Sequence, residues 1–221
     1  MITKSASRFA PSPTGRLHLG HAYSALRAHD LAQAGHGRFL LRIEDIDQTR
    51  CRPEHVVGIY EDLRWLGLNW DRDVMFQSDR HSAYAAALDR IVAQGLAYRC
   101  WCTRAEVAAN IDAPQGDAQP VYPGTCKGRD DQGDGRPYSW RLDVAEAVRR
   151  SGYLTWTDAD AGEVQATPER LGDVVIARKD APAAYHLAVV VDDDWQGVTD
   201  VVRGRDLFDS THIHRLIQHI L

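Results

Sequence analysis

A strand, a loop, a helix and a second strand follow one another at the start of the chain, and this order constrains the fold most. Residues 7–10 lead into the turn-rich loop 11–15, and residues 38–43 form a compact apolar run of strand length. Between them, four residues recur at the i, i+3, i+4 and i+7 spacing of a helix face: Leu19, Ala22, Tyr23 and Leu26. The pattern predicts a βαβ unit and therefore an α/β protein with a parallel sheet.

Similar patterns continue along the chain. Helical spacing recurs in residues 53–63 and 84–91. Four short apolar runs predict further strands, at residues 138–142, 174–177, 188–191 and 198–202. We interpret the acidic residues 192–194 as a cluster at a strand end. The final segment, residues 210–221, is expected to begin a helix whose histidines face solvent.

The composition is that of a globular protein, because 44% of the 221 residues are hydrophobic and 26% are charged. The formal net charge of −5 argues against indiscriminate nucleic-acid binding, so any RNA contact is expected to be local. No apolar run approaches the length of a membrane span, and the first residues do not resemble a secretory signal. We therefore expect a cytoplasmic, monomeric protein without a membrane partner.

The sequence His18-Leu19-Gly20-His21 stands where the first predicted helix begins. Unpaired backbone N–H groups and the positive end of the helix dipole favour an anion at such a position. Gly20 lacks a side chain that would block the approach of a nucleotide, and His18 and His21 are spaced to share one helical face. On spacing alone, a pair of ordinary surface histidines is the alternative to a phosphate site.

Three N-terminal segments together resemble the catalytic domain of class I glutamyl-tRNA synthetases. They are Arg-Phe-Ala-Pro-Ser-Pro-Thr-Gly at residues 8–15, His-Leu-Gly-His at residues 18–21 and Arg-Ile-Glu-Asp-Ile-Asp at residues 42–47. The resemblance resumes at residues 185–193 and 197–204, so it covers nearly the whole chain. It implies a Rossmann-type parallel sheet with a zinc-containing insertion.

The resemblance also implies a division into segments. Residues 1–97 would form the first half of the catalytic domain, residues 98–182 an insertion like an acceptor-binding domain, and residues 183–221 the second half. Class I synthetases carry a second ATP element of the Lys-Met-Ser-Lys-Ser type, and the sequence reaches Leu221 without one. We expect the C-terminal part of the catalytic domain to lie outside this sequence, and these residues alone to bind glutamate better than they activate it.

The resemblance and the chemistry point to the same substrate site. In the family, the loop matching residues 8–12 lines the glutamate pocket, and the glutamate matching Glu44 takes the amino group. A free glutamate needs cations for its side-chain carboxylate, which Arg8 and Arg203 can supply. The alternative is that Arg203 and Glu44 simply pair with their neighbours. The predicted glutamate-binding residues are Arg8, Ala10, Pro11, Ser12, Glu44, Tyr185 and Arg203, and the predicted ATP-binding residues are His18, Gly20 and His21.

Residues 98–137 are rich in Gly, Pro, Asp and Gln, which predicts an irregular insertion that something other than a core must order. Within it, Cys100, Cys102 and Cys126 form a candidate zinc site that lacks a fourth ligand. Their arrangement with Tyr122 resembles the zinc site of glutamyl-Q tRNA(Asp) synthetases, the short paralogues of glutamyl-tRNA synthetases, and this resemblance implies Tyr122 as the fourth ligand. Three free thiols are the alternative.

The small length and the sequence Arg-Gly-Arg-Asp-Leu at residues 203–207 favour the short paralogues. This resemblance implies a ligase that converts L-glutamate and ATP, with Mg²⁺, to glutamyl-adenylate and transfers the glutamyl group to queuosine of tRNA(Asp). One alternative is a catalytic fragment of a glutamyl-tRNA synthetase. Another is a non-catalytic relative that binds an amino acid or RNA, although the intact motifs argue against it.

Overall fold

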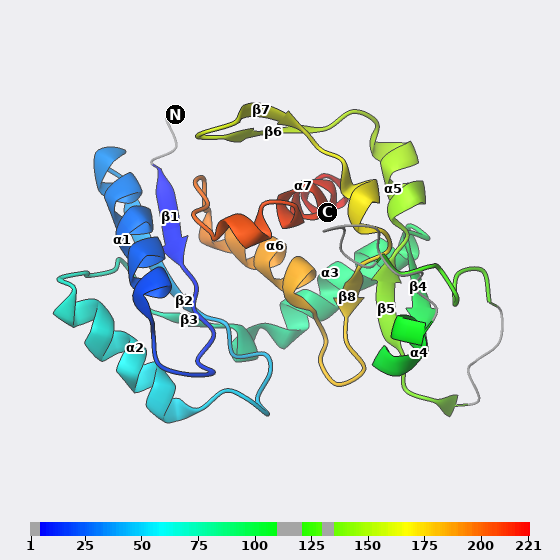
Figure 1. Cartoon of the computed structure of the whole chain (residues 1–221), viewed down its shortest axis with the longest axis horizontal. Helices are drawn as coiled ribbons and strands as arrows, with labels where there is room; N and C mark the ends of the chain where they lie inside the picture. The colour runs from blue at the N-terminus through cyan, green and yellow to red at the C-terminus, as the bar shows by residue number, and fades with distance from the viewer. Residues whose placement is uncertain (1–4, 110–120, 130–134) are drawn as a thin grey trace. The chain divides into compact units, whose positions relative to one another are not determined.

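Two compact units make up the chain. Unit 1 comprises Met1–His81 and Asp192–Arg205, and unit 2 comprises Ser82–Val191 and Asp206–Leu221. Helix α6 (Tyr185–Gln196) contributes residues to both units. The structure is a computed structural model, and the residues that it describes are 5–109, 121–129 and 135–221 (Figure 1).

Unit 1 contains a three-stranded parallel sheet with strand order β1-β2-β3. Its elements in chain order are β1 (Ala6–Phe9), α1 (Leu19–Ala34), β2 (Arg38–Ile43), α2 (Pro53–Trp65), β3 (Met75–Phe76) and the 3-10 helix η1 (Gln77–Arg80). Ser7 of β1 also forms a parallel bridge with Asp200, which brings the segment after α6 beside the sheet. The predicted βαβ unit and parallel sheet are confirmed.

The core of unit 1 forms on one face of this sheet. Alternate residues of a strand point to opposite faces, so Phe39, Leu41 and Ile43 of β2 face the helices while Arg42 faces the other way. Alanines on α1 let that helix approach the sheet closely. The buried core residues are Phe9, Ala25, Ala28, Ala32, Phe39, Leu41, Ile43, Ile59, Leu63 and Leu68.

Unit 2 contains an antiparallel sheet of strand order β4-β5-β8 and the separate hairpin β6-β7. Its helices α5 and α7 contact each other, and both contact η3. The elements that lie wholly or almost wholly in this unit are α3 (His81–Ala93), β4 (Ala97–Cys100), α4 (Arg104–Ala109), β5 (Ser139–Leu142), α5 (Val144–Ser151), β6 (Thr155–Asp158), β7 (Gly162–Gln165), η3 (Pro168–Leu171), β8 (Val175–Ala177), η4 (Arg205–Leu207) and α7 (Ser210–Ile220).

Two of the predicted strands are wrong. Residues 188–191 lie in helix α6, where Ala188, Val189 and Val190 are buried. A short run of apolar residues fits a buried helix as well as a buried strand, so periodicity does not separate the two. Residues 198–202 form the single bridge at Asp200 and no strand.

The C-terminal helix is confirmed as α7, but the prediction that its histidines face solvent is wrong for two of them. His212 and His214 are each 3% exposed. The Trp156 indole N–H and the Thr167 backbone N–H both donate to Nδ1 of His212, at 3.3 Å each. Nε2 of His214 lies 3.1 Å from Nδ1 of His186. These two histidines therefore belong to the interior of unit 2.

Among the described residues, no helix combines the length and the apolar character that crossing a membrane requires. The division of the catalytic domain at residues 1–97, 98–182 and 183–221 stays a prediction.

Candidate functional site

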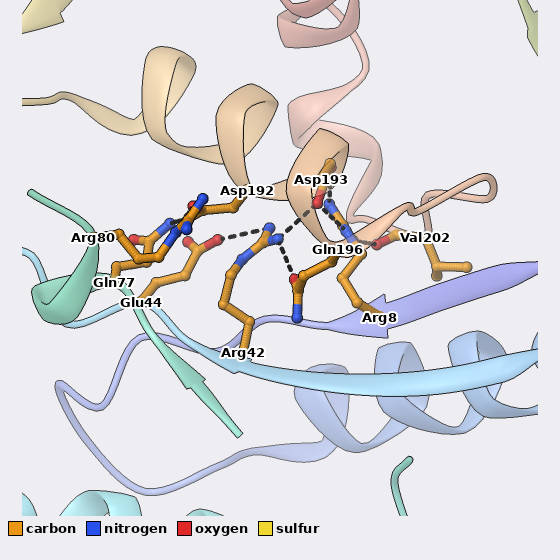
Figure 2. A network of polar contacts seen from close by, with 9 residues as sticks. All are labelled: Arg8, Arg42, Glu44, Gln77, Arg80, Asp192, Asp193, Gln196 and Val202. Carbon is orange, nitrogen blue, oxygen red and sulfur yellow. Dashed lines mark hydrogen bonds and ion pairs between the residues drawn. The ribbon is translucent and has the colours of Figure 1, made fainter. Parts of the chain in front are cut away.

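Two arginines lie on the sheet face of unit 1 that is opposite the core. The strand register pairs Arg8 with Leu40, so Arg8 of β1 and Arg42 of β2 share this face. Arg8 is 5% exposed and Arg42 is 0% exposed. A buried guanidinium needs charged or hydrogen-bonding partners, and helix α6 supplies them from its last turns (Figure 2).

Arg8 forms a bidentate ion pair with Asp193. Its Nε lies 2.9 Å from Oδ1, and its Nη2 lies 3.3 Å from Oδ2. Nη1 donates to the backbone carbonyl of Val202 at 3.1 Å (Figure 2). Arg203 directly follows Val202, so the chain brings the two arginines predicted for the substrate side chain to the same part of unit 1.

Arg42 connects three acceptors. Its Nη1 donates to Asp193 Oδ1 at 2.7 Å and to Gln196 Oε1 at 2.9 Å. Its Nη2 lies 3.4 Å from Oε1 of Glu44. Burial alone would lower the pKa of Arg42, but the negative charges of Asp193 and Glu44 outweigh it and raise that pKa. Arg42 is therefore a permanent cation inside unit 1.

The two carboxylates of this network have pKa values shifted in opposite directions. Burial would raise the pKa of Asp193, but the charges of Arg8 and Arg42 outweigh burial and lower it. For Glu44, burial outweighs the charges of the same arginines and raises the pKa. The backbone N–H of Glu44 donates to the Pro11 carbonyl at 3.0 Å, which joins the loops that follow β1 and β2. Glu44 is thus the carboxylate that gains most from a cationic ligand.

The acidic residues 192–194 lie in α6, so the prediction of a strand-end cluster is wrong. Asp192 is fully buried and accepts hydrogen bonds from Gln77 Nε2 at 2.8 Å and from Arg80 Nε at 3.2 Å. Successive helix residues are rotated by about 100°. Asp192 and Asp193 therefore pair with different arginines although they are neighbours in sequence (Figure 2).

The histidines of the His-x-Gly-His sequence cap helix α1. Nδ1 of His18 accepts from the Gly20 N–H at 3.1 Å, and Nδ1 of His21 accepts from the His18 N–H at 3.3 Å. The two rings stack with 3.8 Å between their centroids. Burial and the neighbouring His18 lower the pKa of His21. Because Nδ1 accepts in both rings, the neutral rings carry their protons on Nε2, where they can donate to an anion.

The other predicted glutamate-site residues are distributed over both units. In unit 1, Ala10 is half-buried, Pro11 is buried and Ser12 is exposed. Tyr185 begins α6 in unit 2 and is 37% exposed. Its ring contacts the ring of His214, with 5.3 Å between the centroids.

The predicted metal ligands come together in unit 2. The sulfur atoms of Cys100, Cys102 and Cys126 all lie within 4.8 Å of one another. The Tyr122 hydroxyl lies 3.3 Å from the Cys100 sulfur and 3.7 Å from the Cys102 sulfur. In tetrahedral zinc sites with Zn–S bonds of about 2.3 Å, the sulfurs are separated by roughly 3.8 Å. The separation of 3.5 Å between Cys102 and Cys126 fits that arrangement.

One cysteine of the cluster is predisposed to the thiolate form that binds metals. Burial opposes ionisation of Cys126, but hydrogen bonds from the Trp101 backbone and the Tyr122 hydroxyl outweigh it and lower the pKa of Cys126 to about 7. Burial raises the pKa of Cys102 to about 11. The donor set therefore fits a zinc ion.

Sequence analysis missed Arg42, Asp193 and Gln196. Two signals for them exist in the sequence: an arginine inside the apolar run Phe-Leu-Leu-Arg-Ile, and three aspartates directly after Val-Val-Val. A charge inside an otherwise buried element requires a buried partner. The partners Arg42 and Asp193 are 151 positions apart, so neither signal identifies the other.

Comparison with known proteins defines the class. The family model of the class I tRNA synthetase (E and Q) catalytic domain matches residues 4–221. This chain belongs to that family, and it is therefore a ligase with the α/β catalytic domain that the parallel sheet of unit 1 indicates.

The curated relatives narrow the comparison. The glutamyl-Q tRNA(Asp) synthetase of Rhodobacter capsulatus is 47% identical over 227 residues, which cover 97% of this chain and 82% of the relative. The protein of the same name from Symbiobacterium thermophilum is 44% identical, over 92% of this chain and 67% of the relative. The glutamyl-Q tRNA(Asp) synthetase of Pseudomonas putida is also 44% identical, over 97% of this chain and 67% of the relative.

Solved structures agree with this family assignment. A glutamate tRNA ligase from Elizabethkingia meningosepticum, crystallised in complex with its amino acid, matches with a TM-score of 0.79 at 28% identity. The match covers 98% of this chain and 47% of the ligase, so this chain spans about half the length of that solved synthetase. The synthetase of Elizabethkingia anophelis matches equally, with a TM-score of 0.79 at 29% identity.

Proposed function

We propose that this chain activates L-glutamate with ATP and transfers the glutamyl group to queuosine of tRNA(Asp). The observation that carries the glutamate assignment is the buried network of unit 1, which holds the Arg8 guanidinium of β1 and the Glu44 carboxylate directly after the neighbouring strand β2. The names of the relatives at 44% to 47% identity support the RNA substrate. A cytoplasmic location and a monomeric state belong to the same proposal.

Side chains of opposite charge bind the two ends of the amino acid. Arg8 and Arg203 bind the side-chain carboxylate, and Glu44 accepts the ammonium group. The backbone of Ala10, Pro11 and Ser12 lines the pocket. Glutamine would leave a desolvated guanidinium without its anion, so it is rejected more strongly than a ligand that only lacks a methylene group.

Activation is an in-line displacement at phosphorus. An oxygen of the substrate α-carboxylate attacks the α-phosphorus of ATP, the P–O bond to the β-phosphate breaks, and pyrophosphate leaves with that bonding pair. His18 and His21 donate from Nε2 to the phosphates, and the absent side chain of Gly20 leaves room for the nucleotide. The protein acts by alignment and by preorganised donors.

Transfer then breaks the mixed anhydride. A hydroxyl of the queuosine ring attacks the glutamyl carbonyl, loses its proton, and AMP leaves with the oxygen that bridged carbon and phosphorus. Mg²⁺ that accompanies ATP neutralises charge on the phosphates. Zinc held by Cys100, Cys102, Tyr122 and Cys126 would order the irregular segment of unit 2, because structural zinc contributes folding free energy directly.

The decisive experiment offers several RNAs to one preparation. The chain is incubated with labelled glutamate and ATP, and then with tRNA(Asp) containing queuosine, tRNA(Asp) lacking it, or tRNA(Glu). We expect label only on the first RNA. Label on tRNA(Glu) would identify a glutamyl-tRNA synthetase instead. Binding of glutamate without ATP–pyrophosphate exchange, both by this chain and by a longer one that includes the second ATP element, would identify a non-catalytic relative.

His21→Ala tests the ATP half of the proposal. Loss of a preorganised donor at the phosphates should lower the exchange rate by about 100-fold. The affinity for glutamate should stay within about twofold, because His21 serves the nucleotide and not the amino acid. His36→Ala, at an exposed turn after α1, is the matched control and should leave both quantities unchanged.

A further inference from the structure

One carboxylate of unit 1 contacts both buried guanidiniums of the proposed glutamate site. Asp193 Oδ1 lies 2.9 Å from Nε of Arg8 and 2.7 Å from Nη1 of Arg42, and its Oδ2 lies 3.3 Å from Nη2 of Arg8. Figure 2 shows Asp193 reaching both arginines from the last turns of α6. Among the interactions described, Asp193 does not contact the histidines that serve ATP.

The ion pair leaves one edge of Arg8 available. A guanidinium carries five N–H bonds. Asp193 takes the hydrogen on Nε and one on Nη2, and the Val202 carbonyl takes one on Nη1. Among the contacts of the described residues, one hydrogen therefore remains on each terminal nitrogen. A pair of terminal N–H groups is the geometry in which an arginine binds a carboxylate through two parallel hydrogen bonds.

The same carboxylate controls the position of Glu44 through Arg42. Arg42 is completely buried, and its Nη1 is held by Asp193 and Gln196 while its Nη2 faces Glu44 at 3.4 Å. Without Asp193, Glu44 would be the carboxylate that remains within hydrogen-bond distance of Arg42 in the described network, while Asp192 acts on Arg42 only through its charge. A Glu44 carboxylate drawn fully to Arg42 would compete poorly for a substrate ammonium group.

We infer that Asp193 is the positioning residue of the glutamate site, acting through Arg8 on the substrate carboxylate and through Arg42 on the carboxylate that binds the substrate ammonium group. This inference rests on the proposed function. In this arrangement, one residue of α6 sets the spacing between the cation, Arg8, and the anion, Glu44, that bind the two ends of a free glutamate. Asp193 touches neither substrate nor ATP, and its role is to hold the groups that do.

The test compares two neighbouring buried aspartates. The full chain and its Asp193→Asn and Asp192→Asn variants are dialysed to equilibrium against labelled L-glutamate, and each is also melted. Asp192 is the matched control because it is equally buried on the same helix but pairs with Gln77 and Arg80. Both variants should melt at a lower temperature, since Asp193→Asn leaves the buried Arg8 without its anion and Asp192→Asn does the same to the half-buried Arg80.

The dissociation constant separates positioning from stability. A purely structural change lowers the fraction of active molecules and leaves the dissociation constant of the folded fraction unchanged. We expect Asp193→Asn to raise the dissociation constant at least about tenfold, the cost of weakening a charged contact, and Asp192→Asn to leave it within about twofold. Equal dissociation constants for Asp193→Asn and the unaltered chain would overturn the inference, and so would an equal rise in both variants.

A second variant decides the matter if Asp193→Asn does not fold. Asp193→Glu keeps the charge but moves the carboxylate by one methylene group, so it should raise the dissociation constant about threefold, less than the asparagine variant. An unchanged value overturns the inference. If the unaltered chain binds no glutamate, the proposed function and the inference are both wrong. If the unaltered chain binds glutamate but the Asp193 variants have the same dissociation constant, only the inference is wrong.

Discussion

The two units place buried polar side chains in opposite settings. In unit 1, the ion pairs of Arg8 and Arg42 with Asp193 lie beside a parallel sheet whose other face carries a core of ten buried residues. In unit 2, Cys100, Trp101, Tyr122 and Cys126 form a small buried cluster, and the partly buried Cys102 packs against it.

This difference shows which of the two sites is complete without a bound metal ion or ligand. Arg8, Arg42, Asp193 and Glu44 balance one another's charges, so the ion pairs of unit 1 form without an added component. The cysteine cluster holds its polar atoms by weak sulfur contacts of 3.3 to 3.7 Å, and a metal ion would replace these with bonds. Unit 1 is preorganised for a ligand, whereas we propose that a metal ion organises the cysteine segment of unit 2.

The largest effect is expected from a substitution that breaks the charge balance of unit 1. Glu44→Gln removes the anion that accepts the substrate ammonium group and should lower the affinity for glutamate by at least about 100-fold, roughly 3 kcal/mol. Equilibrium dialysis measures it. Glu54→Gln, in the first turn of α2, is the control and should bind as the unaltered chain does. A Glu44→Gln variant with unchanged affinity would refute the role of Glu44.

Metal removal should affect unit 2 and spare the sheet of unit 1. After treatment with a chelator, trypsin should cut at Arg104, Lys127 or Arg129 at least about tenfold faster, because the segment loses the ion that orders it. Mass spectrometry of the fragments locates the cuts. Arg38 and Arg42 of β2 should stay protected in the same digest.

A pair of cysteine variants sharpens this result. Cys102→Ser removes a proposed ligand and should reproduce the effect of the chelator. Cys51→Ser, a free thiol of unit 1 outside the cluster, should not. Equal proteolysis of the two variants would show that the cluster holds no ordering metal.

The raised pKa of Glu44 predicts that glutamate binding by unit 1 weakens at acidic pH. The ammonium group needs an ionised Glu44, and burial makes this residue take up a proton at a pH above about 4.3, the ordinary value for a glutamate side chain. The dissociation constant for glutamate should therefore rise as the pH falls from 7 towards 5. N-acetyl-L-glutamate has no ammonium group, and its binding should not weaken over the same range.

The smallest expected effect concerns an ion pair at the surface of unit 2. Glu146 accepts from Arg149 and Arg150 at 2.6 to 2.7 Å, and their hydrogen bonds lower its pKa to about 2. Water screens this cluster, so Glu146→Gln should change the melting temperature by no more than about 1 °C. Asp193→Asn should lower it by several degrees. Calorimetry measures the melting temperatures of both variants and so compares the exposed charge of Glu146 with the buried charge of Asp193. A larger decrease in melting temperature for Glu146→Gln than for Asp193→Asn would contradict this prediction.

Local patterns predicted where the first elements of the chain lie. Helix α1 and strand β2 are present at the predicted residues, but the predicted apolar face of α1 is wrong, because Leu19 and Tyr23 are exposed and Ala25, Ala28 and Ala32 are buried in the core. The pattern failed at residues 188–191, since that part of α6 is apolar on every side and shows no period. It also failed for His212 and His214, whose burial depends on what packs against α7.

The amino-acid sequence by itself determined the chemical inventory: the motif residues, the three clustered cysteines and the local strand–loop–helix order. Only the tertiary structure decided which charges meet. Whether Asp193 or Asp192 reaches Arg8 depends on the rotational phase of α6 and on the register that sets Arg8 beside Leu40. Ion pairing between distant segments is decided by packing, whereas periodicity is a property of neighbours, which is why the sequence predicted the elements of unit 1 but not its network.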